Sequence, residues 1–219
     1  MIDQVMSLWW RLIRFGFRLL YYEMAFTYDW VSKIVSMGQW RCWQRTVIKH
    51  LESSYDVPVL ELAHGTGDLQ IDLHRGGYDS VGYDLSPYMG NIASRKLRRN
   101  QIIPKFARGY GQALPFADAV FPAVVCTFPT PFIIEPATLR ELWRVLQPGG
   151  KLVVVLSGFL TGKSLTESAI EWLYSVTGQR DGDVDAFLQP FTAVGFRAEV
   201  VQEACKGSVA ILVVAEKMV

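Results

Sequence analysis

Short apolar runs alternate with segments of mixed polarity along the chain from residue 58 onward. Five runs have strand length and many apolar side chains: residues 58–62, 80–84, 104–108, a run within 119–127, and 151–156. Three predicted helices lie between them, over residues 67–75, 86–100 and 136–146, and two of these end at Gly-Gly or Pro-Gly-Gly. This alternation predicts an α/β domain built on a mostly parallel sheet.

The last third of the chain continues the alternation of helices and strands but ends with two β segments in succession. Residues 164–176 and 183–194 are predicted to be helical. Residues 198–202 and 209–216 are predicted to be two β segments that close the sheet as an antiparallel pair. No repeat or long linker interrupts the sequence, so we expect one sheet-based domain over residues 51–219.

Residues 1–50 precede the first strand and are expected to form a helical extension or cap. Residues 5–26 are rich in Trp, Leu, Phe and Tyr, and Arg11, Arg14 and Arg18 share one side of a helical wheel. No uninterrupted apolar run approaches about 18 residues, which argues against a transmembrane helix. Such a helix could lie in a membrane interface, or its apolar side could cap the domain or a dimer interface.

Composition narrows the classes of function. Half of the 219 residues are hydrophobic and a fifth are charged, so disorder is not expected. The formal net charge of +1 argues against a strongly basic nucleic-acid binder. Cys42, Cys126 and Cys205 are isolated and odd in number, which indicates reduced, buried thiols, a cytoplasmic protein and no metal site. If residues 5–26 contact lipid, the expected location becomes the inner face of the membrane.

A glycine turn directly follows the first predicted strand. The run ELAHGTG over residues 61–67 ends a strand and opens a helix, which lets the backbone bend sharply and approach a nucleotide closely. Asp84 ends the second strand, 23 residues after Glu61, where a carboxylate can accept hydrogen bonds from both ribose hydroxyls. These features predict a nucleotide-type cofactor without distinguishing between several.

Two further motifs separate the candidate cofactors. Residues 109–118 read GYGQALPFAD and precede the fourth strand, and residues 144–152 read RVLQPGGKL and lead into the fifth. Together with the glycine turn and Asp84, they resemble class I S-adenosylmethionine-dependent methyltransferases. An NAD-dependent dehydrogenase would share only the glycine turn and the acidic residue at the end of the second strand. The resemblance implies a Rossmann-like fold, with a mostly parallel seven-stranded sheet, helices on both faces and an N-terminal helical cap.

The same resemblance implies S-adenosylmethionine as the cofactor and no metal. The residues that match its binding positions lie in the N-terminal segment, the glycine turn, the loops after the second and third strands, and the end of the fourth strand. They are Tyr28, Glu61, Ala63, Gly65, Thr66, Gly67, Asp84, Leu85, Tyr110, Gly111, Gln112 and Thr127.

Motifs outside this core resemble one family more closely, the ubiquinone/menaquinone-biosynthesis C-methyltransferases. Residues 28–31 (YDWV), 36–38 (SMG) and 40–43 (WRCW) are similar to its YDxxN…SxGxxxxWR segment. Residues 61–69 are similar to its DLAGGTGDL, and residues 195–196 and 207–211 to its GF and GIVAI elements. The resemblance implies a quinone-like ring as a candidate acceptor.

Several departures weaken the transfer of that substrate specificity. His64 replaces the family's second glycine, Tyr110 occupies the acidic position that meets adenine, and Pro122 stands where a final acid is expected. The stretch between Leu156 and Gly195 is also shorter than in the quinone enzymes. A lipid headgroup amine therefore stays open as an acceptor beside the quinone-like ring.

Methyl transfer mainly needs in-line alignment of the acceptor and exclusion of water. His64 is the candidate catalytic residue because it lies within the cofactor turn, and packing beside the cofactor is the alternative. Phe128, Phe132 and Trp172 are candidates for the acceptor pocket, with core packing as the alternative.

The sequence therefore predicts methyl transfer to a small, lipophilic acceptor. A soluble small-molecule O- or N-methyltransferase is one alternative, and a non-catalytic cofactor-binding partner protein is another. A nucleic-acid substrate is disfavoured, because FPTPF over residues 128–132 follows the fourth strand in place of an Asn/Asp-Pro-Pro-aromatic element. The sequence does not indicate the oligomeric state.

Overall fold

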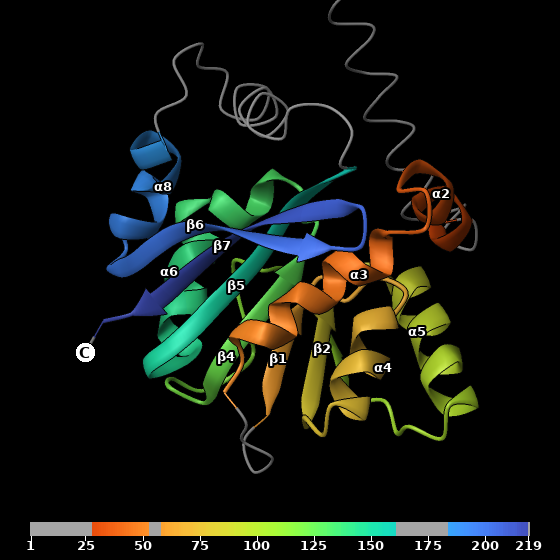
Figure 1. Cartoon of the computed structure of the whole chain (residues 1–219). Coiled ribbons are helices and arrows are strands. Elements are labelled where there is room, and N and C mark those ends of the chain that lie inside the picture. The colour runs from red at the N-terminus through yellow and green to blue at the C-terminus, as the bar shows by residue number, and fades with distance from the viewer. Residues whose placement is uncertain (1–27, 53–57, 161–183, 219) are drawn as a thin grey trace, which may run out of the picture.

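The structure is a computed structural model, and it describes residues 28–52, 58–160 and 184–218. Within these residues, seven strands form one sheet in the order β3-β2-β1-β4-β5-β7-β6 (Figure 1). The strands are β1 (Val59–Leu62), β2 (Ser80–Asp84), β3 (Phe106–Arg108), β4 (Phe121–Thr127), β5 (Leu146–Leu160), β6 (Phe196–Cys205) and β7 (Ser208–Lys217). The predicted α/β fold is confirmed.

The strand order leaves an opening for a ligand beside β1. Strands β1 to β5 pair in parallel, with β2 on one side of β1 and β4 on the other. Consecutive connections therefore diverge from β1 in opposite directions, which leaves a crevice at the carboxyl ends of these strands. Strand β7 runs antiparallel between β5 and β6. This confirms the prediction that two β segments close the sheet as an antiparallel pair.

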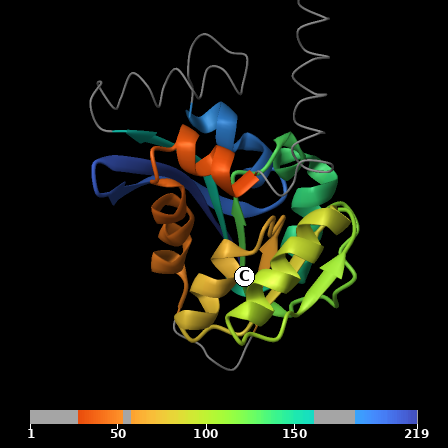
Figure 2. The same ribbon diagram turned by 90° about the vertical axis from the view of Figure 1, so that its right-hand side faces the viewer.

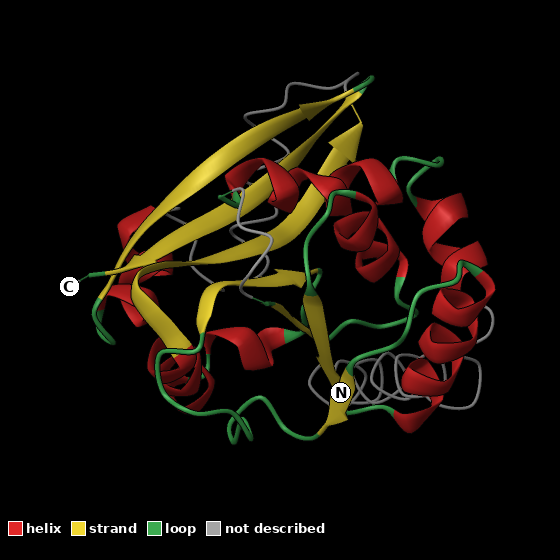
Figure 3. Cartoon of the chain, turned by 90° about the horizontal axis from the view of Figure 1, so that it is seen from below, coloured by secondary structure: helices red, strands yellow, loops and turns green. Residues whose placement is uncertain are grey.

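Helices cover both faces of the sheet (Figure 3). They are α2 (Tyr28–Val35), α3 (Trp40–Arg45), η2 (Thr46–His50), α4 (Asp68–Arg75), α5 (Pro87–Arg99), η3 (Pro131–Ile134), α6 (Pro136–Val145) and α8 (Val184–Thr192). Leu142 of α6 and Phe191 of α8 pack into the core on one face. Trp43 of α3 and Leu73 of α4 pack on the other. Figure 2 shows α5 in front, at the end of the sheet that β3 forms.

Strand β5 differs from its prediction in both bounds. It begins at Leu146 rather than residue 151, because Leu146 pairs with Phe121 of β4 before the register shifts. Gly149 has φ 75, so the Pro-Gly-Gly segment forms an irregularity within the paired strand rather than a turn before it. The strand continues to Leu160, which pairs with Ser208 of β7. The predicted helix over residues 164–176 lies outside the described residues.

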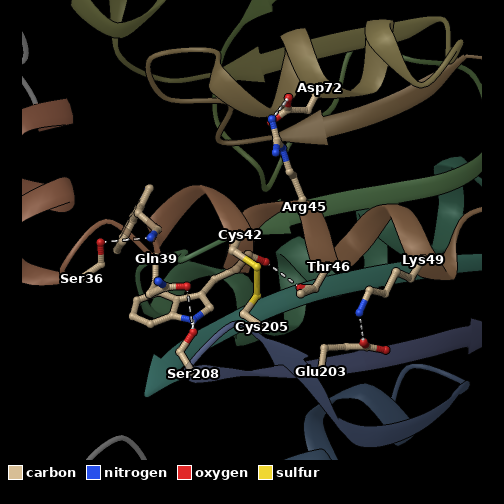
Figure 4. The surroundings of a disulfide bond; sticks show 12 residues. Ser36, Gln39, Cys42, Arg45, Thr46, Lys49, Asp72, Glu203, Cys205 and Ser208 are labelled. Carbon is tan, nitrogen blue, oxygen red and sulfur yellow. Dashed lines mark hydrogen bonds and ion pairs between the residues drawn. A yellow bond between two sulfur atoms is a disulfide. The ribbon is translucent and has the colours of Figure 1, made fainter. Parts of the chain in front are cut away.

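The prediction of three reduced cysteines is wrong for two of them. Cys42 of α3 and Cys205 of β6 form a disulfide across a sequence separation of 163 residues (Figure 4). Their spacing carries no signal for this pair, because the fold alone brings α3 against the end of β6. Cys126 of β4 is a free, buried thiol, as expected.

The N-terminal predictions are tested only in part. In the described part of the chain, no helix is long and apolar enough to cross a membrane. The basic, aromatic helix over residues 5–26 lies outside that part. Helix α3 contacts α4 and β5, so residues 40–45 lie against the sheet-based domain. A division between residues 1–50 and 51–219 stays a prediction.

Candidate functional site

A cavity of about 270 Å³ opens at the carboxyl ends of β1, β2 and β4, where the strand order places a crevice. Its walls come from the glycine turn and from the loops after β2, β3 and β4. They are Leu62, Ala63, Gly65, Tyr83, Asp84, Leu85, Ser86, Met89, Gly109, Tyr110, Gly111, Gln112, Thr127, Phe128, Pro129, Thr130 and Phe132. Most of the residues that the sequence indicated for cofactor and acceptor binding are therefore gathered here.

The glycine turn bends through left-handed backbone at three of five successive residues. Ala63 has φ 57, Gly65 has φ 52 and Gly67 has φ 82. A Cβ built on Gly65 would meet nothing within 4 Å, and Gly65 lines the cavity. A Cβ on Gly67 would lie 2.8 Å from Cβ of Ala93 in α5. Gly65 thus leaves room for a ligand, whereas Gly67 lets two helices pack closely.

Asp84 connects the glycine turn to the loop after β2. Its Oδ2 accepts a hydrogen bond from the Gly65 amide at 2.9 Å, and its Oδ1 accepts one from the Ser86 amide at 2.7 Å. Ser86 then caps α5, because its Oγ accepts a hydrogen bond from the Met89 amide. The carboxylate is thus held at the cavity wall with further lone pairs available for a ligand.

Glu61 lies beneath the turn and does not line the cavity. It is buried, and its Oε2 accepts a hydrogen bond from Nε2 of Gln70 at 2.7 Å. Burial raises the pKa of Glu61 to about 8, against the opposing effect of the Gln70 hydrogen bond. Ser80 donates to Oε1 of Gln70 and completes a buried polar chain from β2 through α4 to β1. Glu61 thus supports the turn from below.

His64 packs into the protein rather than along the cavity wall. Its ring stacks on Phe106 of β3 with centroids 4.3 Å apart, and the residue is only 4% exposed. Gly82 makes the stack possible, because a Cβ there would lie within 3 Å of both rings. Burial lowers the pKa of His64, although Asp84 opposes this. The geometry favours the packing alternative, and the catalytic role stays a prediction.

The loop after β3 forms the outer wall. Tyr110, Gly111 and Gln112 all line the cavity, and Tyr110 is 65% exposed. Gln112 donates to Oε2 of Glu135 at 2.6 Å. A Cβ on Gly111 would approach the Phe132 ring at 3.1 Å, so this glycine lets the loop pack closely against Phe132.

Phe128 forms the wall that faces the N-terminal cap. It follows β4 with φ 52, a backbone conformation that is unfavourable for an aromatic residue. Its ring stacks on Trp40 of α3 with centroids 3.9 Å apart. Phe128 therefore combines an unfavourable backbone conformation with a position at the cavity wall.

The remaining candidates differ in their position. Thr66 is buried, and Lys96 of α5 donates to its Oγ1 at 3.2 Å, so it belongs to the contact between the turn and α5. Leu85 lines the cavity. Tyr28 begins α2, but its side chain lies outside the described part of the structure, as does all of Trp172.

Sequence reasoning missed the contacts that seat α3 beside the cavity. Asp72 of α4 accepts hydrogen bonds from both Arg41 and Arg45 at 2.8–2.9 Å (Figure 4 shows the Arg45 pair). Burial alone would raise the pKa of Asp72, but these two guanidinium groups outweigh it and lower the pKa. The spacing of the two arginines, one helical turn apart, was the available signal.

Gln44, between these arginines, was also missed. Its Nε2 donates to Oγ1 of Thr127 at 3.3 Å, across the boundary between α3 and β4. Trp43 donates to Oγ of Ser208. Ser208 in turn donates to Oε1 of Gln39 (Figure 4). No motif links these positions, because the fold alone brings them together.

Comparisons with known proteins identify relatives by sequence and by structure. The model of the ubiE/COQ5 methyltransferase family matches residues 18–210. A demethylmenaquinone methyltransferase of Deinococcus radiodurans is 34% identical over 139 residues, which are 62% of this chain and 58% of that protein. The chain spans between 51% and 63% of the length of the first such relatives.

Solved structures share the fold at low sequence identity. A geranyl diphosphate methyltransferase in complex with SAM has a TM-score of 0.61 and 14% identity, and the match covers 81% of this chain and 85% of that one. The [4+2]-cyclase SpnF has a TM-score of 0.62 and 18% identity, over 82% of each chain. Such identities establish the fold alone, and the second name shows that this fold is not restricted to one reaction. The family model, however, matches most of the sequence, and the chain belongs to the ubiE/COQ5 methyltransferase family.

Proposed function

We propose that this chain transfers the methyl group of S-adenosylmethionine to a small, lipophilic acceptor with a quinone-like ring. One observation carries the proposal: the Asp84 carboxylate and the open face of Gly65 share the wall of a cavity at the carboxyl ends of β1 and β2. That is where an open α/β sheet binds a nucleotide-type cofactor.

The described residues fit this cofactor. Asp84 would accept hydrogen bonds from the ribose hydroxyls while the Gly65 and Ser86 amides hold its carboxylate in place. Leu85, Tyr110, Gly111 and Gln112 would surround the adenine, where an exposed tyrosine can stack on the ring. When bound, S-adenosylmethionine supplies an electrophilic sulfonium methyl group.

The acceptor side of the cavity favours a ring over a charged headgroup. Phe128, Pro129 and Phe132 line it, and no Lys or Arg is among the described lining residues. A phosphate-bearing headgroup would find no cation there, whereas an aromatic ring can pack on these side chains. The name of the Deinococcus radiodurans relative supports the same class of acceptor.

No described lining residue other than Asp84 carries a carboxylate or imidazole. Proton removal from the acceptor then falls to solvent or to a group outside the described residues. We propose a packing role for His64, because its ring stacks on Phe106 of β3.

Peripheral membrane contact through residues 5–26, at the cytoplasmic face, is part of the proposal. A lipophilic acceptor would be drawn from the bilayer, and the three arginines within this segment would meet anionic headgroups. Flotation with liposomes of phosphatidylglycerol, comparing the full chain with a truncated chain that begins at Glu23, tests it. Equal flotation of the two chains would contradict it.

The activity is tested with labelled S-adenosylmethionine and a short-chain prenylated 1,4-naphthohydroquinone, followed by mass identification of the product. A C-methylated product is expected from the wild-type chain, with Asp84→Ala strongly impaired. Calorimetry with S-adenosylmethionine and S-adenosylhomocysteine runs in parallel. If neither compound binds, the proposal is overturned. That result would also contradict the two alternatives, a soluble methyltransferase and a cofactor-binding partner protein.

A further inference from the structure

Gln44 reaches from the N-terminal cap to the wall of the cavity. Its Nε2 donates to Oγ1 of Thr127 at 3.3 Å, and Thr127, at the carboxyl end of β4, lines the cavity. Helix α3 is held at this position by the stack of Trp40 on Phe128 and by the disulfide of Cys42. Trp40 and Cys42 both precede Gln44 in α3, so these two contacts hold the helix where Gln44 meets Thr127.

The Gln44 side chain uses only part of its hydrogen-bonding capacity. Its Oε1 is buried and has no partner among the described residues, and the Thr127 contact is the one hydrogen bond that these residues give it. A buried amide oxygen without a partner destabilises the folded state. Other residues hold α3 in place, because Arg41 and Arg45 bind Asp72 and Trp43 binds Ser208. Stability of the cap therefore does not explain why a glutamine is buried here.

In the contact with Gln44, the Thr127 hydroxyl oxygen is the acceptor. A threonine hydroxyl carries one proton and can accept through its lone pairs, so an oxygen that accepts from Gln44 keeps its proton for another acceptor. No described residue accepts that proton. Thr127 is 9% exposed and lines the cavity, so a ligand bound beside Phe128 can accept this proton.

We propose that Thr127 donates its hydroxyl proton to the ring oxygen of a phenolic acceptor, and that Gln44 is the positioning residue that directs this donor. The inference rests on the proposed function and adds a specificity determinant to it. A hydrogen-bond donor stabilises the phenolate, the form in which the ring carbon is nucleophilic, and the phenol releases its proton to water. Because the described lining offers no separate base for the phenol, easier ionisation of the acceptor takes over part of that task.

The test measures the ionisation of a bound phenol directly. A 2-alkyl-4-nitrophenol, whose phenolate absorbs visible light, is titrated from pH 5 to 9 with the full chain and saturating S-adenosylhomocysteine. We expect the wild-type chain to lower the pKa of the bound phenol by about one unit relative to Thr127→Val, which removes the donor and keeps the shape. Gln44→Leu should lower the pKa of the bound phenol less than the wild-type chain does. Thr127→Ser should behave as wild type.

Gln39→Leu is the matched control, since Gln39 lies in the same cap but accepts from Ser208 rather than contacting the cavity. The pH profile of methylation of the naphthohydroquinone should move with the nitrophenol pKa in Thr127→Val and stay unchanged in Gln39→Leu. Circular dichroism and the affinity for S-adenosylhomocysteine establish that each variant is folded.

Three outcomes overturn the inference: no binding of the nitrophenol to the wild-type chain, equal pKa values in all variants, or loss of cofactor affinity alone in Thr127→Val. The last would make Thr127 a cofactor contact. If the wild-type chain still methylates the naphthohydroquinone, only this inference fails. If it also fails to bind S-adenosylmethionine, the proposed function fails as well.

Discussion

The carboxylate of Asp84 accepts a hydrogen bond from the amide of Gly65 at 2.9 Å. This bond joins the end of β2 to the turn after β1, at the carboxyl ends of two strands that pair in parallel. It brings two sequence-distant motif elements to one cavity wall. A site organised in this way loses little conformational freedom when it binds its ligand.

Replacing Asp84 should therefore weaken cofactor binding. Asp84→Ala removes the acceptor for the ribose hydroxyls and for the Gly65 amide, and we expect S-adenosylmethionine affinity to fall by about tenfold to a hundredfold. Calorimetry measures it. Asp79→Asn, which alters an exposed ion pair with Lys105, is the matched control. Wild-type affinity in Asp84→Ala would contradict the ribose assignment.

The two glycines of the turn should separate binding from stability. In Gly65→Ala the added methyl group occupies the open side that faces the cavity, so cofactor affinity should fall more than thermal stability. In Gly67→Ala the methyl group would lie 2.8 Å from Cβ of Ala93, so stability should fall first. Both substitutions also strain a left-handed backbone. Thermal denaturation and calorimetry on the two variants distinguish the effects, and identical behaviour would contradict this division.

Glu61 should make stability depend on pH. The folded state raises its pKa from 4.5 to about 8, so between these values the folded chain holds a proton that the unfolded chain has released. The free energy of unfolding should then decrease as pH rises through this window, by at most about 1.4 kcal/mol per pH unit from this group. Urea denaturation at pH 5 to 9 measures it.

Glu61→Gln provides the comparison, because its side-chain oxygen can still accept the hydrogen bond from Gln70 but the side chain does not titrate. Its unfolding free energy should change less across the same pH window than that of the wild-type chain. Equal slopes in the two proteins would show that Glu61 is ionised in the folded state.

Removing the disulfide should loosen the cap from the sheet. The Cys42–Cys205 bond closes a loop of 163 residues, and loss of such a bond commonly costs about 2–5 kcal/mol of stability. We expect dithiothreitol to lower the melting temperature of the wild-type chain and to leave Cys42→Ser/Cys205→Ser unchanged. If the reductant has no effect on the wild-type chain, the two cysteines are not bonded in solution.

Local sequence was sufficient to predict that the glycine turn and Asp84 meet. Residues 61–67 and Asp84 lie at strand ends, and strands that pair in parallel bring their carboxyl ends to one edge, so their meeting follows from the order of elements alone. The antiparallel finish was predictable for a different reason. Two strand-length segments that lie close together in the sequence can pair as a hairpin.

Side-chain direction and long-range contacts required the tertiary structure. His64 turns toward Phe106 because Gly82 leaves space for its ring, which no feature of the glycine turn indicates. The early start of β5 depends on pairing with Phe121.

The sequence by itself determined the family resemblance, the glycine turn and the succession of strands along the chain, since these depend on short runs of neighbouring residues. Only the tertiary structure decided that Cys42 bonds Cys205 and that Gln44 contacts Thr127. Both pairs join the cap to the sheet across long separations. Such contacts arise from packing between elements, which spacing along the chain does not encode.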